Sequence, residues 1–135
     1  MAKWSIDLKK WAKKTQVDIE DVLKESSIFI FSRVILMSPV DTGRFRANWI
    51  SSVGQPMSGV ISDATDKSGS ITISTMTGVV EKFQISDKSL HLVNSLPYAV
   101  RLEYGWSKQA PAGMVRLVAR DFKNTVERAI RKRRK

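Results

Sequence analysis

Apolar residues recur with helical spacing in the first third of the chain. From residue 19 to Met37 they lie three, four or seven positions apart, which predicts a long helix. Thr15 is the predicted N-cap, with acidic residues in the first turns, and Pro39 is expected to end the helix. Residues 28–37 are apolar nearly all round, so this half of the helix is expected to be buried.

The two ends of the chain carry amphipathic patterns of their own. Trp4, Leu8 and Trp11 predict a short basic helix within residues 1–15. Near the other end, an apolar residue at every fourth position from Met114 to Ile130 predicts one continuous amphipathic helix. Residues 131–135 are all Lys or Arg, so we expect them to fray rather than to pack.

The middle of the chain mixes strand and helix patterns. Residues 48–53 and 89–94 predict strands, whereas residues 71–83 fit a helix better because their longer apolar pattern is helical. Pro97 favours the first turn of a short helix that Gly105 ends. Residues 54–70 and 106–113 predict loops. The sequence therefore predicts an α+β fold, with helices packed on one face of a small, mainly antiparallel sheet.

Composition limits the class of protein. A chain of 135 residues with 42% hydrophobic residues fits a single domain, residues 1–135, with one core. No apolar run approaches the roughly 20 residues of a membrane-spanning helix, so no membrane partner is expected. The sequence has no cysteine, which excludes disulfides and thiolate zinc sites.

Charge is concentrated at the ends. The formal net charge is +10, and residues 101–135 alone carry eleven basic and three acidic residues. This asymmetry indicates a polyanionic partner, either nucleic acid or an acidic protein surface, although a solvated tail is an equal alternative. The candidate contacts are the terminal cations Arg131, Lys132, Arg133, Arg134 and Lys135.

Motifs that carry chemistry are scarce. The sequence has no P-loop, dinucleotide-binding or serine-nucleophile motif. The lone His91 is interpreted as structural, and Asp63 and Asp66 as residues for loop solubility and turn formation. No catalytic residue, metal or cofactor is therefore predicted.

Glu103 is the most notable carboxylate, because it lies among apolar and aromatic residues. We expect it to cap a helix or to pair with an arginine such as Arg101 or Arg116. A hydrolase that uses Glu103 with a second, unidentified group is the weakest of the functional hypotheses, because one acid is not a catalytic pair.

Two stretches carry a resemblance to a known family. Residues 38–49 read Ser-Pro-Val-Asp-Thr-Gly-Arg-Phe-Arg-Ala-Asn-Trp after a helix. The second stretch is residues 94–107, Asn-Ser-Leu-Pro-Tyr-Ala-Val-Arg-Leu-Glu-Tyr-Gly-Trp-Ser, together with residues 109–116, Gln-Ala-Pro-Ala-Gly-Met-Val-Arg. Their order resembles the phage tail-component family typified by gene product 10 of phage HK97, over about residues 20–130. In that family a Pro-Val-Asp-Thr-Gly turn follows a helix, and a Pro-Tyr-Ala-x-x-x-Glu-x-Gly segment precedes the terminal helix.

The resemblance implies a non-enzymatic structural protein of the virion neck, similar to tail-completion or tail-terminator proteins. It implies a ring of six or twelve copies that contacts the head-tail connector or adaptor and the tail tube or tail terminator, in virions assembled in the host cytoplasm. The motif residues would mark the fold and a ring contact, with the aromatic ones divided between core and interface. They are Pro39, Asp41, Thr42, Gly43 and Arg44 in the turn, and Pro97, Tyr98, Glu103, Tyr104, Gly105 and Trp106 in the second segment. The alternative function is a basic-tailed module that binds DNA without sequence preference.

Overall fold

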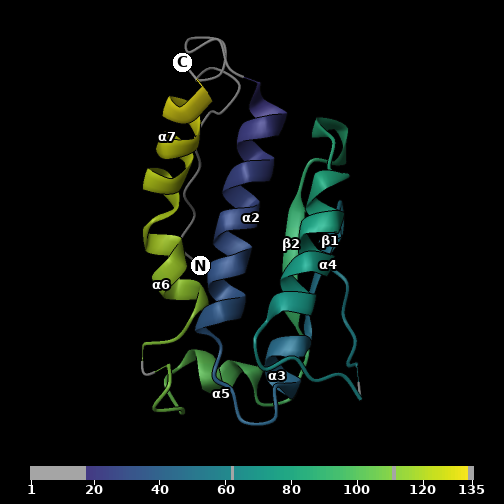
Figure 1. Cartoon of the computed structure of the whole chain (residues 1–135), viewed down its shortest axis with the longest axis vertical. Helices are drawn as coiled ribbons and strands as arrows, with labels where there is room; N and C mark the ends of the chain where they lie inside the picture. Colours follow the sequence, from purple (N-terminus) through teal and green to yellow (C-terminus); the bar gives the residue numbers. More distant parts are fainter. Residues whose placement is uncertain (1–17, 62, 111, 134–135) are drawn as a thin grey trace.

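The computed structural model describes residues 18–61, 63–110 and 112–133 (Figure 1). The helix predicted within residues 1–15 lies outside them. The elements in chain order are α2 (Ile19–Met37), α3 (Arg44–Ala47), β1 (Trp49–Val53), α4 (Ser70–Glu81), the 3-10 turn η1 (Ile85–Asp87), β2 (Leu90–Asn94), α5 (Ala99–Glu103), α6 (Val115–Arg120) and α7 (Phe122–Arg133).

The predicted α+β fold is confirmed. Strands β1 and β2 form a two-stranded antiparallel sheet, in which Trp49 lies opposite Asn94 and Val53 opposite Leu90. Helix α4 packs on β1, and α2 packs between α4 on one side and α6 and α7 on the other (Figure 1). The strands and the helix predicted for residues 71–83 are therefore correct to within a few residues.

Helix α2 supplies a buried side chain to each part of the core. Its Val22 packs against Val126 and Ile130 of α7. Its Ile35 packs against Met76 of α4, in a cluster that the sheet also contacts. The largest cluster brings α2 and α6 together with the two stretches that carry the family resemblance; its buried members are Val34, Phe45, Leu96, Ala110, Met114 and Val118.

The ends of α2 differ in part from the prediction. The helix begins at Ile19, and Asp18 is its N-cap, because the Asp18 carboxylate accepts a hydrogen bond from the Asp21 N–H at 3.2 Å. The prediction of Thr15 as the N-cap is therefore wrong, and Thr15 itself lies outside the described residues. The prediction that the apolar half of the helix, residues 28–37, is buried is also wrong, since Phe29 and Leu36 are exposed. The predicted end of the helix before Pro39 is confirmed.

The single C-terminal helix that the sequence predicts is divided in two. Asp121 leaves the helical conformation between α6 and α7, and its side chain accepts a hydrogen bond from Arg33 of α2 at 3.1 Å. The prediction that residues 131–135 fray is wrong for residues 131–133, because α7 continues to Arg133. Lys132 and Arg133 both pair with Glu25 of α2, at 3.2 and 3.5 Å.

Pro97 is also placed differently from the prediction. Helix α5 begins at Ala99, so Pro97 lies in the turn before the helix rather than at its first position. Gly105 does end this helix, with a φ of 88° that a residue with a side chain rarely adopts.

Candidate functional site

The two stretches that resemble the phage family meet at one end of the molecule, around α3 and α5 (Figure 1). The Val40 N–H donates to Gln109 Oε1 at 2.8 Å, and Gln109 Nε2 donates to the Val40 carbonyl at 2.9 Å. A cleft of about 260 Å³ lies between them, lined by residues 39–45 of the first stretch and by Tyr98, Leu102, Ser107 and Gln109 of the second. We call this junction the motif corner.

Gly43 is required by the shape of the turn at the motif corner. Its φ is 90°, and a Cβ atom at this position would lie 2.7 Å from the Lys67 backbone nitrogen. Its carbonyl accepts a hydrogen bond from the Asp66 N–H at 3.1 Å, which ties the turn to the loop before α4. Thr42 Oγ1 accepts from the Arg44 N–H at 3.2 Å, so the Thr42 side chain helps to form the turn.

Arg46 joins three segments at the motif corner. Its guanidinium donates to the carbonyls of Leu36 and Ser38, at 2.9 and 2.8 Å, and to the Lys67 carbonyl at 2.6 Å. The first two carbonyls lie at the end of α2, where helix carbonyls lack helical partners. Arg46 is not among the residues predicted from the sequence. A signal was present, because a cation shortly after a helix end is well placed to bind such carbonyls.

Asn48 and Gln109 are the other residues that sequence reasoning missed. Asn48 is fully buried, and its side chain binds the Arg44 carbonyl and both backbone polar groups of Ile61. Both residues hold loops by side-chain bonds to a distant backbone. No spacing rule would have identified them, because their partners are set by the tertiary fold.

Glu103 caps helix α6 from the end of α5. Its Oε1 accepts from the backbone N–H groups of Met114 and Val115, at 3.0 and 2.9 Å. Its Oε2 accepts from the backbone and the side chain of Arg116, at 3.1 and 2.9 Å. Both predicted roles, capping and pairing with an arginine, are confirmed, with Arg116 as the partner.

Burial of the Glu103 carboxyl raises its pKa, but the hydrogen bonds from Met114, Val115 and Arg116 outweigh burial and hold the pKa below its ordinary value. The carboxylate is therefore ionised at neutral pH. With four donors already directed at its two oxygens, it has little capacity left to accept a proton from a substrate.

Three large side chains project from α5 and the residues just after it. Val100, Tyr104 and Trp106 are 68%, 64% and 73% exposed. Arginine guanidinium groups lie on both aromatic rings: Arg101 is 5.0 Å from the Trp106 ring centre and Arg116 is 4.5 Å from that of Tyr104. We call Val100, Tyr104 and Trp106 the α5 patch. Exposed Trp, Tyr and Arg together are typical of protein interfaces.

The remaining motif residues take other positions. Tyr98 is half-buried and packs on Phe45 of the first stretch, with ring centres 5.9 Å apart, whereas Tyr104 and Trp106 are exposed. Pro39 is buried, whereas Asp41 is exposed. Of the terminal cations, Arg131 is exposed on α7, and Arg134 and Lys135 lie outside the described residues.

Asp66 corrects the sequence interpretation. It is buried, and its carboxylate accepts hydrogen bonds from the Thr72 N–H and hydroxyl, each at 2.8 Å, and from the Gly69 N–H at 3.1 Å. The expected turn formation is confirmed, because Asp66 closes the turn that starts α4, but the role in loop solubility is wrong, because the side chain is buried. Asp63, by contrast, is exposed.

His91 lies on β2, and its Nε2 is 2.9 Å from Oγ of Ser89, the residue before the strand. Among residues 18–61, 63–110 and 112–133, no three His, Cys, Asp or Glu side chains gather in a way that could hold a metal ion. None of the helices described combines the length and the apolar character needed to cross a bilayer.

The chain was compared with protein-family models, with curated proteins and with solved structures, and it matches none of them.

Proposed function

We propose that the chain is a structural protein of the virion neck, where six or twelve copies form a ring between the head-tail connector and the tail. The observation that carries the proposal is the α5 patch, which lies in the segment that resembles the phage tail-component family. Its contacts would be protein surfaces of other copies and of the connector, tail tube or terminator proteins.

The α5 patch has properties that suit a permanent contact. Its backbone is held by the Glu103 cap on one side, and the Gln109 bonds to Val40 anchor the loop that follows it. Little conformational entropy would then be lost on assembly, and this loss is one of the main costs of binding. In a closed ring, the patch of one copy contacts a different surface of the next.

The alternative is a module that binds DNA through the basic end of the chain. It is supported by exposed cations on α6 and α7, among them Arg120, Arg128 and Arg131. Two further cations, Lys132 and Arg133, pair with Glu25 and are partly neutralised. This mode predicts binding that weakens steeply with salt and does not require a ring.

The copy number in virions separates the two functions. Quantitative mass spectrometry of isolated, intact particles of the phage that encodes the chain is expected to give about six or twelve copies, the counts of closed rings. Light scattering of the purified protein gives its assembly state in solution. Absence from particles, together with a monomer that binds DNA, would replace the neck assignment with the DNA-binding module.

A matched pair of variants tests the α5 patch itself. Trp106→Ser removes the most exposed ring of the patch, and Ile85→Ser removes an exposed apolar side chain at η1. Both are surface changes that should leave the fold unchanged. Incorporation into particles is expected to fall at least about tenfold for Trp106→Ser alone, the loss expected from an interface hot spot. Equal incorporation of the two variants would exclude the patch as the contact.

A further inference from the structure

Among the residues that the structure describes, strand β1 has a neighbouring strand, β2, on one side only. The Gly54 N–H donates to the Ser89 carbonyl at 2.9 Å, directly after the last residue of β1. In an antiparallel pair, opposite residues alternate between those that exchange hydrogen bonds and those that do not. Counting back from Gly54, the backbones of Ser52 and Ile50 face β2, in agreement with the register.

The intervening residues Trp49, Ser51 and Val53 direct their backbone N–H and C=O groups to the other edge of β1. Within the described part of the chain, these outward groups make no hydrogen bond. Unpaired strand groups form a template for another strand, and protected edges usually carry a charge or a proline. β1 has neither, since it reads Trp-Ile-Ser-Ser-Val.

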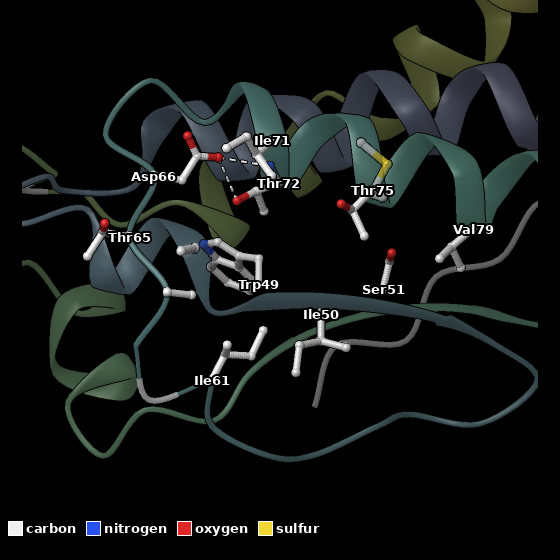
Figure 2. Close-up of a pocket in the computed structure, with 13 residues that line it drawn as sticks. Trp49, Ile50, Ser51, Ile61, Thr65, Asp66, Ile71, Thr72, Thr75 and Val79 are labelled. Carbon is white, nitrogen blue, oxygen red and sulfur yellow. Dashed lines mark hydrogen bonds between the residues drawn. The ribbon is translucent and has the colours of Figure 1, made fainter.

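This edge forms the floor of an apolar groove of about 280 Å³ (Figure 2). Helix α4 makes one wall, from which Ile71 projects with 71% exposure. The loop that carries Ile61 makes the other wall, and Figure 2 shows Ile61 and α4 on opposite sides of β1. Of the described residues that line the groove, only Asp66 is charged, and its carboxylate is bound by Gly69 and Thr72.

We propose that this groove binds an extended, uncharged segment of a different protein, rich in β-branched and apolar residues, which adds to β1 as a third strand. The open backbone groups require a partner that brings its own backbone donors and acceptors. The uncharged walls exclude a charged segment, because its charges would lose water without gaining a partner.

The depth of the groove selects the kind of segment. The edge is recessed between α4 and the Ile61 loop, so a strand that already belongs to a sheet with helices on it would collide with these walls. A free arm or a long loop fits between them. This site is separate from the α5 patch and does not depend on the proposed function.

A synthetic peptide of about seven alternating Val and Thr residues, a usual strand length, is the probe. Titrated into the ¹⁵N-labelled full chain, it is expected to shift the amide signals of Trp49, Ser51 and Val53 and to slow their hydrogen exchange. The control is the same peptide with N-methyl groups on every residue, which removes the backbone donors from both of its edges. No binding at about 1 mM peptide, the weak end of specific affinity, would overturn the proposal. Equal binding of the methylated peptide would also overturn it, because the side chains alone would then be responsible.

Two proline variants test which residues of β1 direct their backbone N–H groups to the open edge. Ser51→Pro removes an outward N–H and is expected to keep the fold while abolishing peptide binding, because proline is tolerated at an edge. Ser52→Pro removes an N–H that faces β2 and is expected to destabilise the protein. If Ser51→Pro fails to fold, Ile71→Lys tests the groove from α4. It is expected to weaken binding at least about tenfold, as a buried charge would, whereas Ile85→Lys leaves binding unchanged.

Hydrogen exchange of the free protein identifies other occupants. The amides of Trp49, Ser51 and Val53 are expected to exchange faster than those of Ile50 and Ser52 at every protein concentration. Protection at all concentrations would mean that a segment of the same chain fills the groove. Protection that appears only on concentration would mean that a second copy does. Either result would overturn the proposed partner.

Discussion

The side-chain amide of Gln109 forms two hydrogen bonds with the backbone of Val40, 69 residues away in sequence. The pair closes the motif corner, because Val40 belongs to the turn after α2 and Gln109 to the loop after α5. Neither residue is part of an element of regular structure, so this contact joins two loops directly.

Replacement of Gln109 by alanine is expected to lower the free energy of unfolding by about 1 kcal/mol, because two backbone groups of Val40 lose their partner in a partly hydrated site. Urea denaturation measures the change. Lys108→Ala, at the neighbouring exposed position, is the control and should change stability by less than about 0.5 kcal/mol. Equal effects of the two substitutions would mean that the bonds to Val40 contribute nothing.

Glu103→Gln is expected to lower the free energy of unfolding by about 1–3 kcal/mol at neutral pH, because the cap of α6 and the Arg116 pair both lose a charged acceptor. Glu127→Gln is the control. Glu127 also pairs with a cation, Lys123 at 4.0 Å, but this pair is exposed and should contribute less than about 0.5 kcal/mol.

The stability difference between wild type and Glu103→Gln is expected to depend on pH. The pKa of Glu103 is lower in the folded protein than its ordinary value of 4.5, so its contribution to stability is fully present above that pH. The contribution is lost as the pH falls through the lower, folded-state pKa. The difference between wild type and Glu103→Gln, measured by urea denaturation, should therefore shrink between pH 5 and acidic pH. A difference independent of pH would show that shape, not charge, makes the cap.

Asp66→Asn and Asp63→Asn form a second matched pair. Burial raises the pKa of the Asp66 carboxyl, but hydrogen bonds from Thr72, Gly69 and Ser68 outweigh burial and lower the pKa overall. Asp66→Asn replaces one acceptor oxygen with an NH₂ group that faces the N–H and O–H donors of Gly69 or Thr72. The variant is expected to lower the free energy of unfolding by about 1–3 kcal/mol. The change at exposed Asp63 should stay within about 0.5 kcal/mol. Thermal unfolding of both variants checks this, and a larger loss at Asp63 would contradict the assignment.

Two glycine substitutions are expected to act in opposite directions. Gly43→Ala combines a φ of 90° with a Cβ atom within 3 Å of the backbone of residues 66 and 67, and should destabilise the protein by about 2 kcal/mol or more. Gly78→Ala lies in α4 with no atom within 4 Å of the new Cβ, and should stabilise it by about 0.5–1 kcal/mol. Calorimetry of the two variants measures both changes in stability. If Gly43→Ala were as stable as the wild type, the turn would not require glycine at residue 43.

Features set by nearby residues could be predicted from the sequence. Pro39 removes a backbone donor and ends α2 within one residue of the prediction, and the four-residue apolar spacing of α6 and α7 follows from helix geometry. In both cases the physical cause acts over a few positions of the chain. For Glu103 the sequence predicted a cap or an arginine pair, but only the fold selected Arg116, 13 residues later, over Arg101.

Features that depend on distant residues could not be predicted. Asp121 interrupts the C-terminal helix where Arg33 of α2 binds its side chain, and Lys132 and Arg133 are ordered by Glu25 instead of fraying. Asp66 could be separated from Asp63 only once the fold had buried one of them. The sequence by itself determined the class of fold, most of the elements and the end of α2 at Pro39. Only the tertiary structure decided which polar groups are paired and which edge of β1 is left open, because hydrogen bonding and burial depend on contacts between segments far apart in the chain.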